Sequence, residues 1–181
     1  MNKSKIRSEI LEYRKKKFQK NLKINLDKFF SFLKINTRNA KIIGGYYPSN
    51  YEIDDLEILD TLNKQNFKIS LPIVKKNNQM NFYSWSKKDP LKINKFGIPE
   101  PVSFKIVYPD ILLVPLVGYD KDLNRLGYGG GFYDRYIEKI DKIKKVTKIG
   151  LAFSYQKIKS VPIDHNDKKL DFIITEKEIV K

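Results

Sequence analysis

Residues 111–116, Ile-Leu-Leu-Val-Pro-Leu, form the most hydrophobic run of this chain. A run with no polar residue fits a strand that is buried on both faces, as in a parallel sheet covered by helices. Apolar residues recur at helical spacing on both sides of this strand, over residues 53–62 and 132–143. Strands that alternate with helices predict an α/β fold, a three-layer-like sandwich around a mostly parallel sheet.

The other segments fit the same prediction. A helix is expected from Lys3 to about Leu33, with a break near Asn21, because apolar residues recur there at helical spacing. Residues 89–109 contain four prolines and little periodicity, so they are expected to form a loop-rich connection. With no linker in its 181 residues, the chain is expected to be a single domain, 1–181. Further strands are expected over residues 41–47, 69–74, 80–85, 148–153 and 172–175.

The composition excludes several classes of protein. The chain has no cysteine, so it contains neither a disulfide framework nor a thiolate metal site. No apolar run approaches the roughly 20 residues that span a bilayer, and the N-terminus shows no export signal. We therefore expect a cytoplasmic protein without a membrane partner.

The net charge of +15 makes a nucleic-acid-binding protein the first alternative. Proteins that read nucleic acids depend on arginine for bidentate contacts to phosphate and guanine. In this chain lysine supplies most of the positive charge, so we expect no nucleic-acid partner and a small anionic substrate instead. The arginines are Arg7, Arg14, Arg38, Arg125 and Arg135.

Residues 125–135, Arg-Leu-Gly-Tyr-Gly-Gly-Gly-Phe-Tyr-Asp-Arg, carry the strongest functional signal. Glycines let backbone N–H groups approach an anion, and the helix expected to follow adds unpaired N–H groups at its start. The loop lacks the Gly-Lys-Ser/Thr of a Walker A motif, and Phe132 stands where a dinucleotide fingerprint has Gly or Ala. A flexible or tight turn without a ligand is the alternative explanation.

The charged residues around the loop favour a site for phosphate and magnesium. Arg125 can neutralise phosphate oxygens, and a carboxylate such as Asp134 tolerates a nearby phosphate only when a cation lies between them. Asp167 is the candidate for a second metal ligand. The alternatives are a helix-start carboxylate for Asp134 and local turn hydrogen bonds for Asp167, and His165 is expected to be a surface turn residue.

With this loop, the chain resembles the 5-formyltetrahydrofolate cyclo-ligase family, whose members are also called methenyltetrahydrofolate synthetases. The resemblance covers nearly the whole chain, and the order of its motifs is what makes it specific. The motifs are Lys3–Arg7, Tyr47 with residues 52–54, residues 96–101, residues 110–115, the loop 125–135, Val161-Pro162, Asp167 and Asp171.

The resemblance implies an α/β sandwich and an ATP-dependent and Mg²⁺-dependent ligase. Such an enzyme converts 5-formyltetrahydrofolate to 5,10-methenyltetrahydrofolate by phosphorylating the formyl oxygen, and releases ADP and phosphate. ATP and a reduced folate would be the partners, and we expect a monomer or weak dimer. A protein that senses the nucleotide without catalysis is a further alternative.

The resemblance also implies roles for individual residues. Tyr128 and Gly130 stand where some relatives have Arg and Lys, so Arg125 and the loop backbone would contribute more to phosphate binding here. The metal ligands would be Asp134 and Asp167. The residues implied in ATP binding are Lys3, Ser4, Lys5, Ile6, Arg7, Arg125, Leu126, Gly127, Tyr128, Gly129, Gly130, Gly131, Phe132 and Tyr133, and those implied in folate binding are Tyr47, Glu52, Tyr128, Gly129, Gly130, Gly131 and Phe132.

Overall fold

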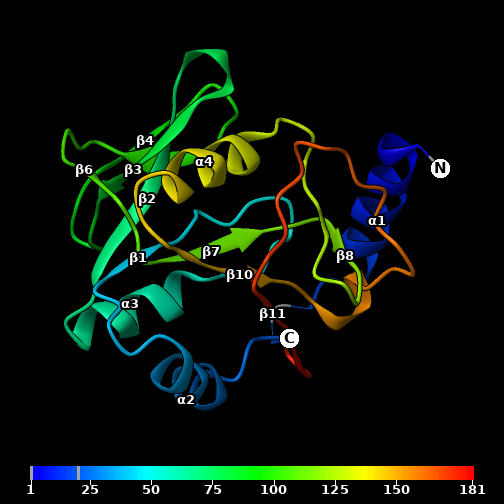
Figure 1. The fold of residues 1–181 in the computed structure, drawn as a ribbon, viewed down its shortest axis with the longest axis horizontal. Helices are drawn as coiled ribbons and strands as arrows, with labels where there is room; N and C mark the ends of the chain where they lie inside the picture. The colour runs from blue at the N-terminus through cyan, green and yellow to red at the C-terminus, as the bar shows by residue number, and fades with distance from the viewer. Residues whose placement is uncertain (1, 20) are drawn as a thin grey trace.

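The computed structural model describes residues 2–19 and 21–181 of the chain. Within these ranges the α-helices are α1 (Lys3–Lys17), α2 (Leu26–Asn36), α3 (Leu56–Lys64) and α4 (Phe132–Asp141) (Figure 1). The large sheet contains, from edge to edge, β12 (Ile179–Val180), β11 (Phe172–Ile174), β10 (Thr147–Leu151), β7 (Ile111–Pro115), β1 (Ile42–Gly44), β2 (Lys68–Val74), β3 (Met80–Ser84) and β6 (Ile106–Val107). Two small sheets pair β4 (Leu91–Ile93) with β5 (Pro99–Pro101) and β8 (Gly118–Tyr119) with β9 (Arg125–Leu126), and short 3-10 helices span Lys76–Asn78 and Ser154–Gln156.

The central strands of the large sheet are parallel. β11, β10, β7, β1 and β2 pair in parallel, whereas β12, β3 and β6 join antiparallel at the two edges. Four of the seven pairings are therefore parallel, which confirms the predicted α/β fold around a mostly parallel sheet. Residues 111–114 are completely buried, as their composition predicts.

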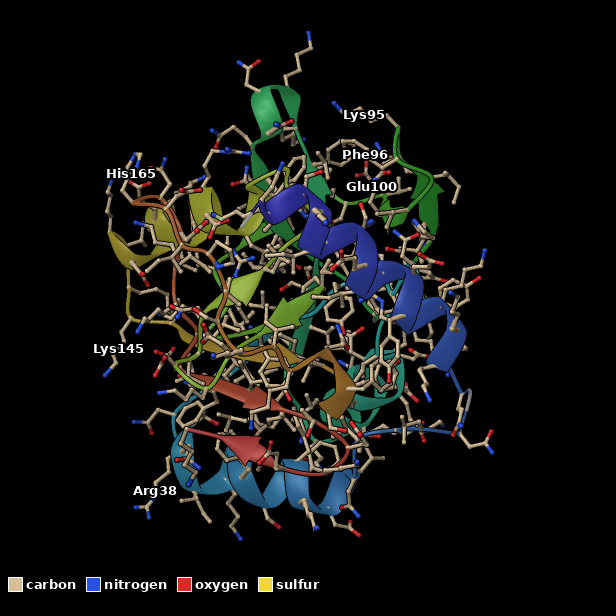
Figure 2. The ribbon with its side chains drawn as sticks, turned by 90° about the vertical axis from the view of Figure 1, so that its right-hand side faces the viewer. Arg38, Lys95, Phe96, Glu100, Lys145 and His165 are labelled. Atoms are coloured by element: carbon tan, nitrogen blue, oxygen red, sulfur yellow. The ribbon has the colours of Figure 1, made fainter. Side chains whose placement is uncertain are left out.

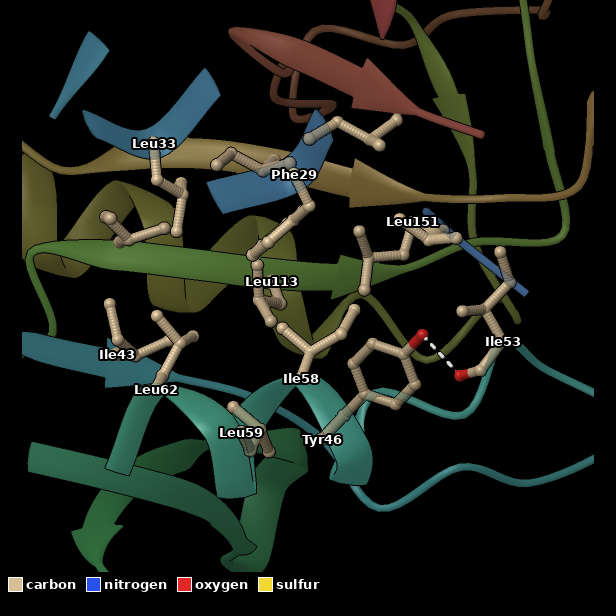
Figure 3. Close-up of a cluster of buried hydrophobic side chains, with 14 of the residues drawn as sticks. Phe29, Leu33, Ile43, Tyr46, Ile53, Ile58, Leu59, Leu62, Leu113 and Leu151 are labelled. Atoms are coloured by element: carbon tan, nitrogen blue, oxygen red, sulfur yellow. Dashed lines mark hydrogen bonds between the residues drawn. The ribbon is translucent and has the colours of Figure 1, made fainter. Parts of the chain in front are cut away.

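Helices cover both faces of this sheet (Figure 1). Ile111 and Leu113 of β7 pack in a cluster with residues of α2 and α3, part of which is shown in Figure 3. Leu112 and Val114 point to the other face, where they pack with residues of α4. Alternate side chains of a strand point to opposite faces, so one apolar strand supports both layers of the core.

Helix α1 lies at one end of the molecule, beside β8 (Figure 1). It ends at Lys17 and α2 begins at Leu26, so the predicted long helix is two helices. The side chains of Asn2 and Asn25 cap the two helices by accepting hydrogen bonds from Ser4 N and Lys28 N.

Helix α3 begins three residues later than the apolar spacing predicts. The segment before it is held in a non-helical conformation, partly because the hydroxyl of Tyr46 donates to the carbonyl oxygen of Ile53 at 2.8 Å (Figure 3). Asp55 is the N-cap residue of α3, but its buried side chain accepts instead from Tyr46 N at 3.0 Å.

Residues 89–109 are loop-rich, as expected, and also contain the short strands β4, β5 and β6. β5 tolerates its prolines because its neighbouring residues make the hydrogen bonds to the β4 side of the hairpin. Ile98 O accepts one of these bonds and Val102 N donates another, so Pro99 and Pro101, which have no N–H, are not needed as donors. The glycine-rich loop does not follow β7 directly, because the β8–β9 hairpin lies between them.

Candidate active site

A cavity of about 1070 Å³ opens at the carboxyl ends of the parallel strands β1, β2 and β7. Its walls include Tyr47 after β1, Val74 at the end of β2 and Pro115 at the end of β7. Open α/β sheets bind their ligands at this edge, because the connections that follow parallel strands gather there. Residues 125–135 form a further wall, so the glycine-rich loop lies at the ligand-binding edge of the sheet.

The glycine-rich loop runs from β9 to the start of α4. Gly129 (φ 99°) and Gly131 (φ 64°) have left-handed backbone conformations, which residues with a side chain rarely adopt. Among the hydrogen bonds of the described residues, none has the backbone N–H of residues 128–131 as its donor. The first turn of α4 adds the unpaired N–H groups of any helix start. The loop therefore offers several amide donors to an anion.

Helix α1 supplies a positively charged wall of the cavity. Arg7 Nε donates to the carbonyl oxygen of Gly127 at 2.7 Å. Lys3, one helical turn earlier, places Nζ 2.6 Å from one carboxylate oxygen each of Asp164 and Asp167. Both cations line the cavity, so the structure brings them to the glycine-rich loop as the resemblance implies.

The rest of the predicted N-terminal segment does not line this cavity. Ser4 and Lys5 are exposed, and Ile6 is buried in a small cluster with Leu126 and Val161. Ile6 thus anchors α1 next to the loop. The predicted site residues that line the cavity are Lys3, Arg7, Tyr47, Glu52, residues 125–134 and Asp167.

Arg125 is buried beside the loop and points its guanidinium at the start of α4. Its Nη2 lies 2.6 Å from Asp134 Oδ1. Its Nε, like the hydroxyl of the neighbouring Tyr133, is buried and has no hydrogen-bond partner in the part of the chain that the structure describes. Buried polar atoms are rarely left unpaired, so both groups keep unused hydrogen-bonding capacity beside the cavity.

Asp134 and Asp167 lie close to one another. Lys168 N, the amide next to Asp167, donates to Asp134 Oδ1 at 3.0 Å. Oδ2 of Asp134 and Oδ1 of Asp167 accept no hydrogen bond from residues 2–19 or 21–181. The same residues contain no group of three or more His, Cys, Asp or Glu that could hold a metal. Two carboxylates fit Mg²⁺, which often takes its remaining ligands from phosphate and water.

The ion pairs of this wall shift the pKa values of their members. Burial opposes ionisation of Asp167, but hydrogen bonds from Lys3 and from the amide of Asp164 outweigh it and lower the pKa of Asp167. Burial likewise opposes the charge of Lys3, yet the two aspartates raise the pKa of Lys3. Both groups are therefore charged at neutral pH. His165, in the same turn, is exposed as predicted (Figure 2).

A second polar group of the cavity surrounds Glu52, which is 7% exposed. Its Oε2 accepts from Ser49 N at 2.7 Å and from Ser49 Oγ at 3.3 Å. Burial raises the pKa of Glu52, and its neighbours Tyr128 and Ser49 offset the effect only in part.

The aromatic residues Phe82, Trp85 and Phe96 differ in their position relative to the cavity. Phe82 and Trp85 are buried in the core. Phe96 is 51% exposed, lines the cavity and makes an edge contact with Phe132, with 5.8 Å between ring centroids. It lies at the tip of the β4–β5 hairpin (Figure 2).

Sequence reasoning did not assign a role to Arg14 or Asp120. Arg14 is buried and bonded to Tyr128, and Asp120 holds the β8–β9 hairpin. Arg14 had a usable signal, because successive spacings of four and seven residues separate Lys3, Arg7 and Arg14 and place all three on one side of a helix. Asp120 in Asp-Lys-Asp-Leu-Asn had only the general signal of a turn.

Fold and cavity together define an α/β protein with a polar cavity at the carboxyl ends of its parallel strands. The sequence model of the 5-formyltetrahydrofolate cyclo-ligase family matches residues 1–176. A 5-formyltetrahydrofolate cyclo-ligase of Haemophilus influenzae is 36% identical over 143 residues, which cover 75% of this chain and 76% of that protein.

Two solved structures have the same fold. A 5,10-methenyltetrahydrofolate synthetase of Aquifex aeolicus superposes with a TM-score of 0.79 at 30% identity, covering 99% of this chain and 92% of that one. A 5,10-methenyltetrahydrofolate synthetase of Mycoplasma pneumoniae gives a TM-score of 0.72 at 27% identity, covering 98% of this chain and 100% of that one. The chain belongs to the 5-formyltetrahydrofolate cyclo-ligase family, a family of ligases.

Proposed function

We propose that this protein converts 5-formyltetrahydrofolate to 5,10-methenyltetrahydrofolate with ATP and Mg²⁺, and releases ADP and phosphate. The observation that carries the proposal is a single cavity in which unpaired loop amides meet Lys3, Arg7 and Arg125. Backbone amides and cations in this arrangement suit a triphosphate. Membership of the cyclo-ligase family supports the folate as the second substrate.

The reaction explains why a phosphate site is needed. The formyl oxygen attacks the γ-phosphorus of ATP, and ADP leaves. N10 of the folate then attacks the formyl carbon and loses its proton, while the C–O bond breaks and phosphate departs. Without phosphorylation this oxygen would be a very poor leaving group. The protein has to hold the γ-phosphate against the formyl oxygen and neutralise the charge on the transferred group.

Each part of the cavity has a role in this proposal. Lys3, Arg7, Arg125 and the amides of residues 127–131 bind and orient the phosphates. Asp134 and Asp167 would hold the magnesium ion, which neutralises charge on phosphate oxygens when it is bound.

The folate would occupy the part of the cavity lined by aromatic and carboxylate groups. Tyr47, Glu52, Tyr128 and Phe132, which the resemblance implies, all line the cavity, and Phe96 contacts Phe132. Aromatic rings bind a flat ring system through large contact areas, and Glu52 supplies an acceptor for its N–H groups.

The direct test is to incubate the protein with 5-formyltetrahydrofolate and Mg-ATP and to follow the near-ultraviolet absorbance of the methenyl product. We expect product only when ATP, folate and magnesium are all present. Calorimetry with Mg-ATP is run in parallel. Nucleotide binding without product would favour a noncatalytic nucleotide sensor, and the absence of both binding and product would reject the phosphate site as well.

A further inference from the structure

Arg14 is the largest side chain among the fully buried residues of the described chain, and it lies in the last turns of α1. It is 1% exposed, and it belongs to none of the ion pairs that the described residues form. A buried arginine without a carboxylate partner is costly unless its N–H groups are bonded. The two bonds that it does make therefore indicate its role.

Both bonds lead to the region around the cavity. Arg14 Nη1 donates to the carbonyl oxygen of Leu116 at 3.1 Å, just after β7. Arg14 Nη2 donates to the hydroxyl oxygen of Tyr128, and Cζ lies 5.6 Å from the centroid of the Tyr128 ring. The first bond anchors the guanidinium to the sheet, and the second holds a residue of the glycine-rich loop.

Arg14 holds the hydroxyl of Tyr128. Because Arg14 donates to the hydroxyl oxygen, the hydroxyl hydrogen of Tyr128 remains available as a donor. Burial and the nearby Glu52 carboxylate raise the pKa of Tyr128, and Ser49 holds that carboxylate through its amide and its hydroxyl. Tyr128 and Glu52 line the cavity, whereas Arg14 lies behind this wall.

We infer that Arg14 is a positioning residue for the folate part of the cavity, which acts by holding the hydroxyl of Tyr128 so that the Tyr128 side chain keeps its place in the cavity wall. The inference rests on the proposed folate substrate. It goes beyond that proposal because it makes α1 a component of both halves of the cavity. Lys3 and Arg7 serve the phosphate half, and Arg14 serves the folate half.

A double-mutant cycle tests this inference by calorimetric titration of 5-formyltetrahydrofolate without ATP. Arg14→Gln and Tyr128→Phe should each weaken folate binding about tenfold, in line with the loss of a hydrogen bond to a charged group. The double variant should bind no more weakly than the weaker single variant, because both changes break the same Arg14–Tyr128 hydrogen bond. The affinity for Mg-ATP should change less than that for the folate. Lys15→Gln, an exposed neighbour on α1, is the matched control and should leave both affinities unchanged.

Several results would overturn the inference. These are full additivity of the two substitutions, an equal loss of folate and ATP affinity, or unchanged folate affinity in Arg14→Gln. If Arg14→Gln does not fold, Arg14→Lys replaces it in the same cycle, because it keeps the charge but not the two-donor fork. If the wild-type protein binds the folate but forms no product, and the cycle gives the expected affinities, the proposed reaction is rejected and the role of Arg14 is supported. If the wild-type protein does not bind the folate, both are rejected.

Discussion

Gly129 shows how a single backbone conformation shapes the phosphate part of the cavity. Its φ of 99° disfavours any residue with a side chain. A Cβ at this position would lie 3.3 Å from Cζ of Arg7. The absence of a side chain therefore serves both the backbone conformation and the placement of Arg7 against the loop.

We expect Gly129→Ala to lower the free energy of unfolding by about 1–2 kcal/mol through backbone strain. The displaced loop and Arg7 should also raise the KM for ATP roughly tenfold, which corresponds to a loss of about 1.4 kcal/mol in ATP binding. Gly97→Ala is the control, since Gly97 also has a positive φ of 76° but no neighbouring atom within 4 Å of its Cβ position. It should lose stability without a change in the KM for ATP. Thermal melts and initial rates over a range of ATP concentrations measure both effects. An equal rise in KM for the two variants would contradict the role of Arg7.

Asp134 is the residue at which the metal assignment is tested. Asp134→Asn keeps the size of the side chain and an acceptor for Lys168 N, but removes the charge that would bind magnesium and that pairs with Arg125. We expect turnover to fall about 10²–10³-fold, as on loss of one preorganised electrostatic contact, together with some loss of stability. Asp164→Asn, which affects only an exposed partner of Lys3, should have a much smaller effect on turnover. Wild-type turnover in folded Asp134→Asn would contradict the assignment.

At the scale of elements, the β8–β9 hairpin sets the position of Arg125. Asp120 is its central acceptor: Oδ1 accepts from the amides of Asp122 and Asn124, and Oδ2 accepts from Val161 N and Asn124 Nδ2 at 2.9 and 3.0 Å. Burial opposes the charge of Asp120, but these four donors outweigh it and lower the pKa of Asp120.

Asp120→Asn should therefore destabilise the protein at neutral pH by about 1–3 kcal/mol, because the new amide group would face donors. A lowered folded-state pKa contributes stability above the unfolded-state pKa, which is about 3.9 for Asp, and this contribution is lost as the pH falls through the folded-state pKa. The difference in the free energy of unfolding between wild type and Asp120→Asn should accordingly narrow below about pH 4. Urea unfolding at a series of pH values measures this difference. Asp122→Asn, whose exposed carboxylate is not part of this acceptor, is the control.

At the scale of the whole molecule, the cavity is built from parts that lie far apart in the sequence. Helix α1 carries Lys3 and Arg7, the sheet carries the strand ends, and the turn at residues 164–167 carries Asp167. No helix of the described ranges is both long and apolar enough to cross a membrane. Cytoplasmic location, a monomer or weak dimer, and the absence of a nucleic-acid partner stay predictions from the sequence.

A ligand that bridges these parts should stabilise the whole domain. Mg-ATP at 100 times its Kd adds about 2.7 kcal/mol to the free energy of unfolding, and for a domain of this size we expect Tm to rise by about 5–10 °C. Differential scanning fluorimetry with ATP, with and without magnesium, measures the shift. GTP serves as a comparison for base preference. No shift with Mg-ATP at any concentration would contradict a nucleotide site in this cavity.

The local pattern of the sequence determined the main elements of this protein. The apolar run at 111–116 predicts a buried strand because a strand covered on both faces of a parallel sheet buries every side chain. The glycine-rich loop predicts an anion site because glycine adopts left-handed backbone conformations without strain and allows a close approach of amides. Both signals lie within a few consecutive residues, so they can be recognised without a fold.

Contacts between distant residues were decided by the tertiary structure alone. Arg7 bonds to Gly127 across 120 positions, and Lys3 to Asp167 across 164. Phe82 and Phe96 are the same residue type, yet one fills the core and the other lines the cavity, because burial depends on the strand face and the neighbouring elements. Arg14 acquires its partners only when α1 packs beside β8 and the loop. Hydrogen bonds and burial depend on distances in space, and these arise when the sheet assembles and its helices pack against it.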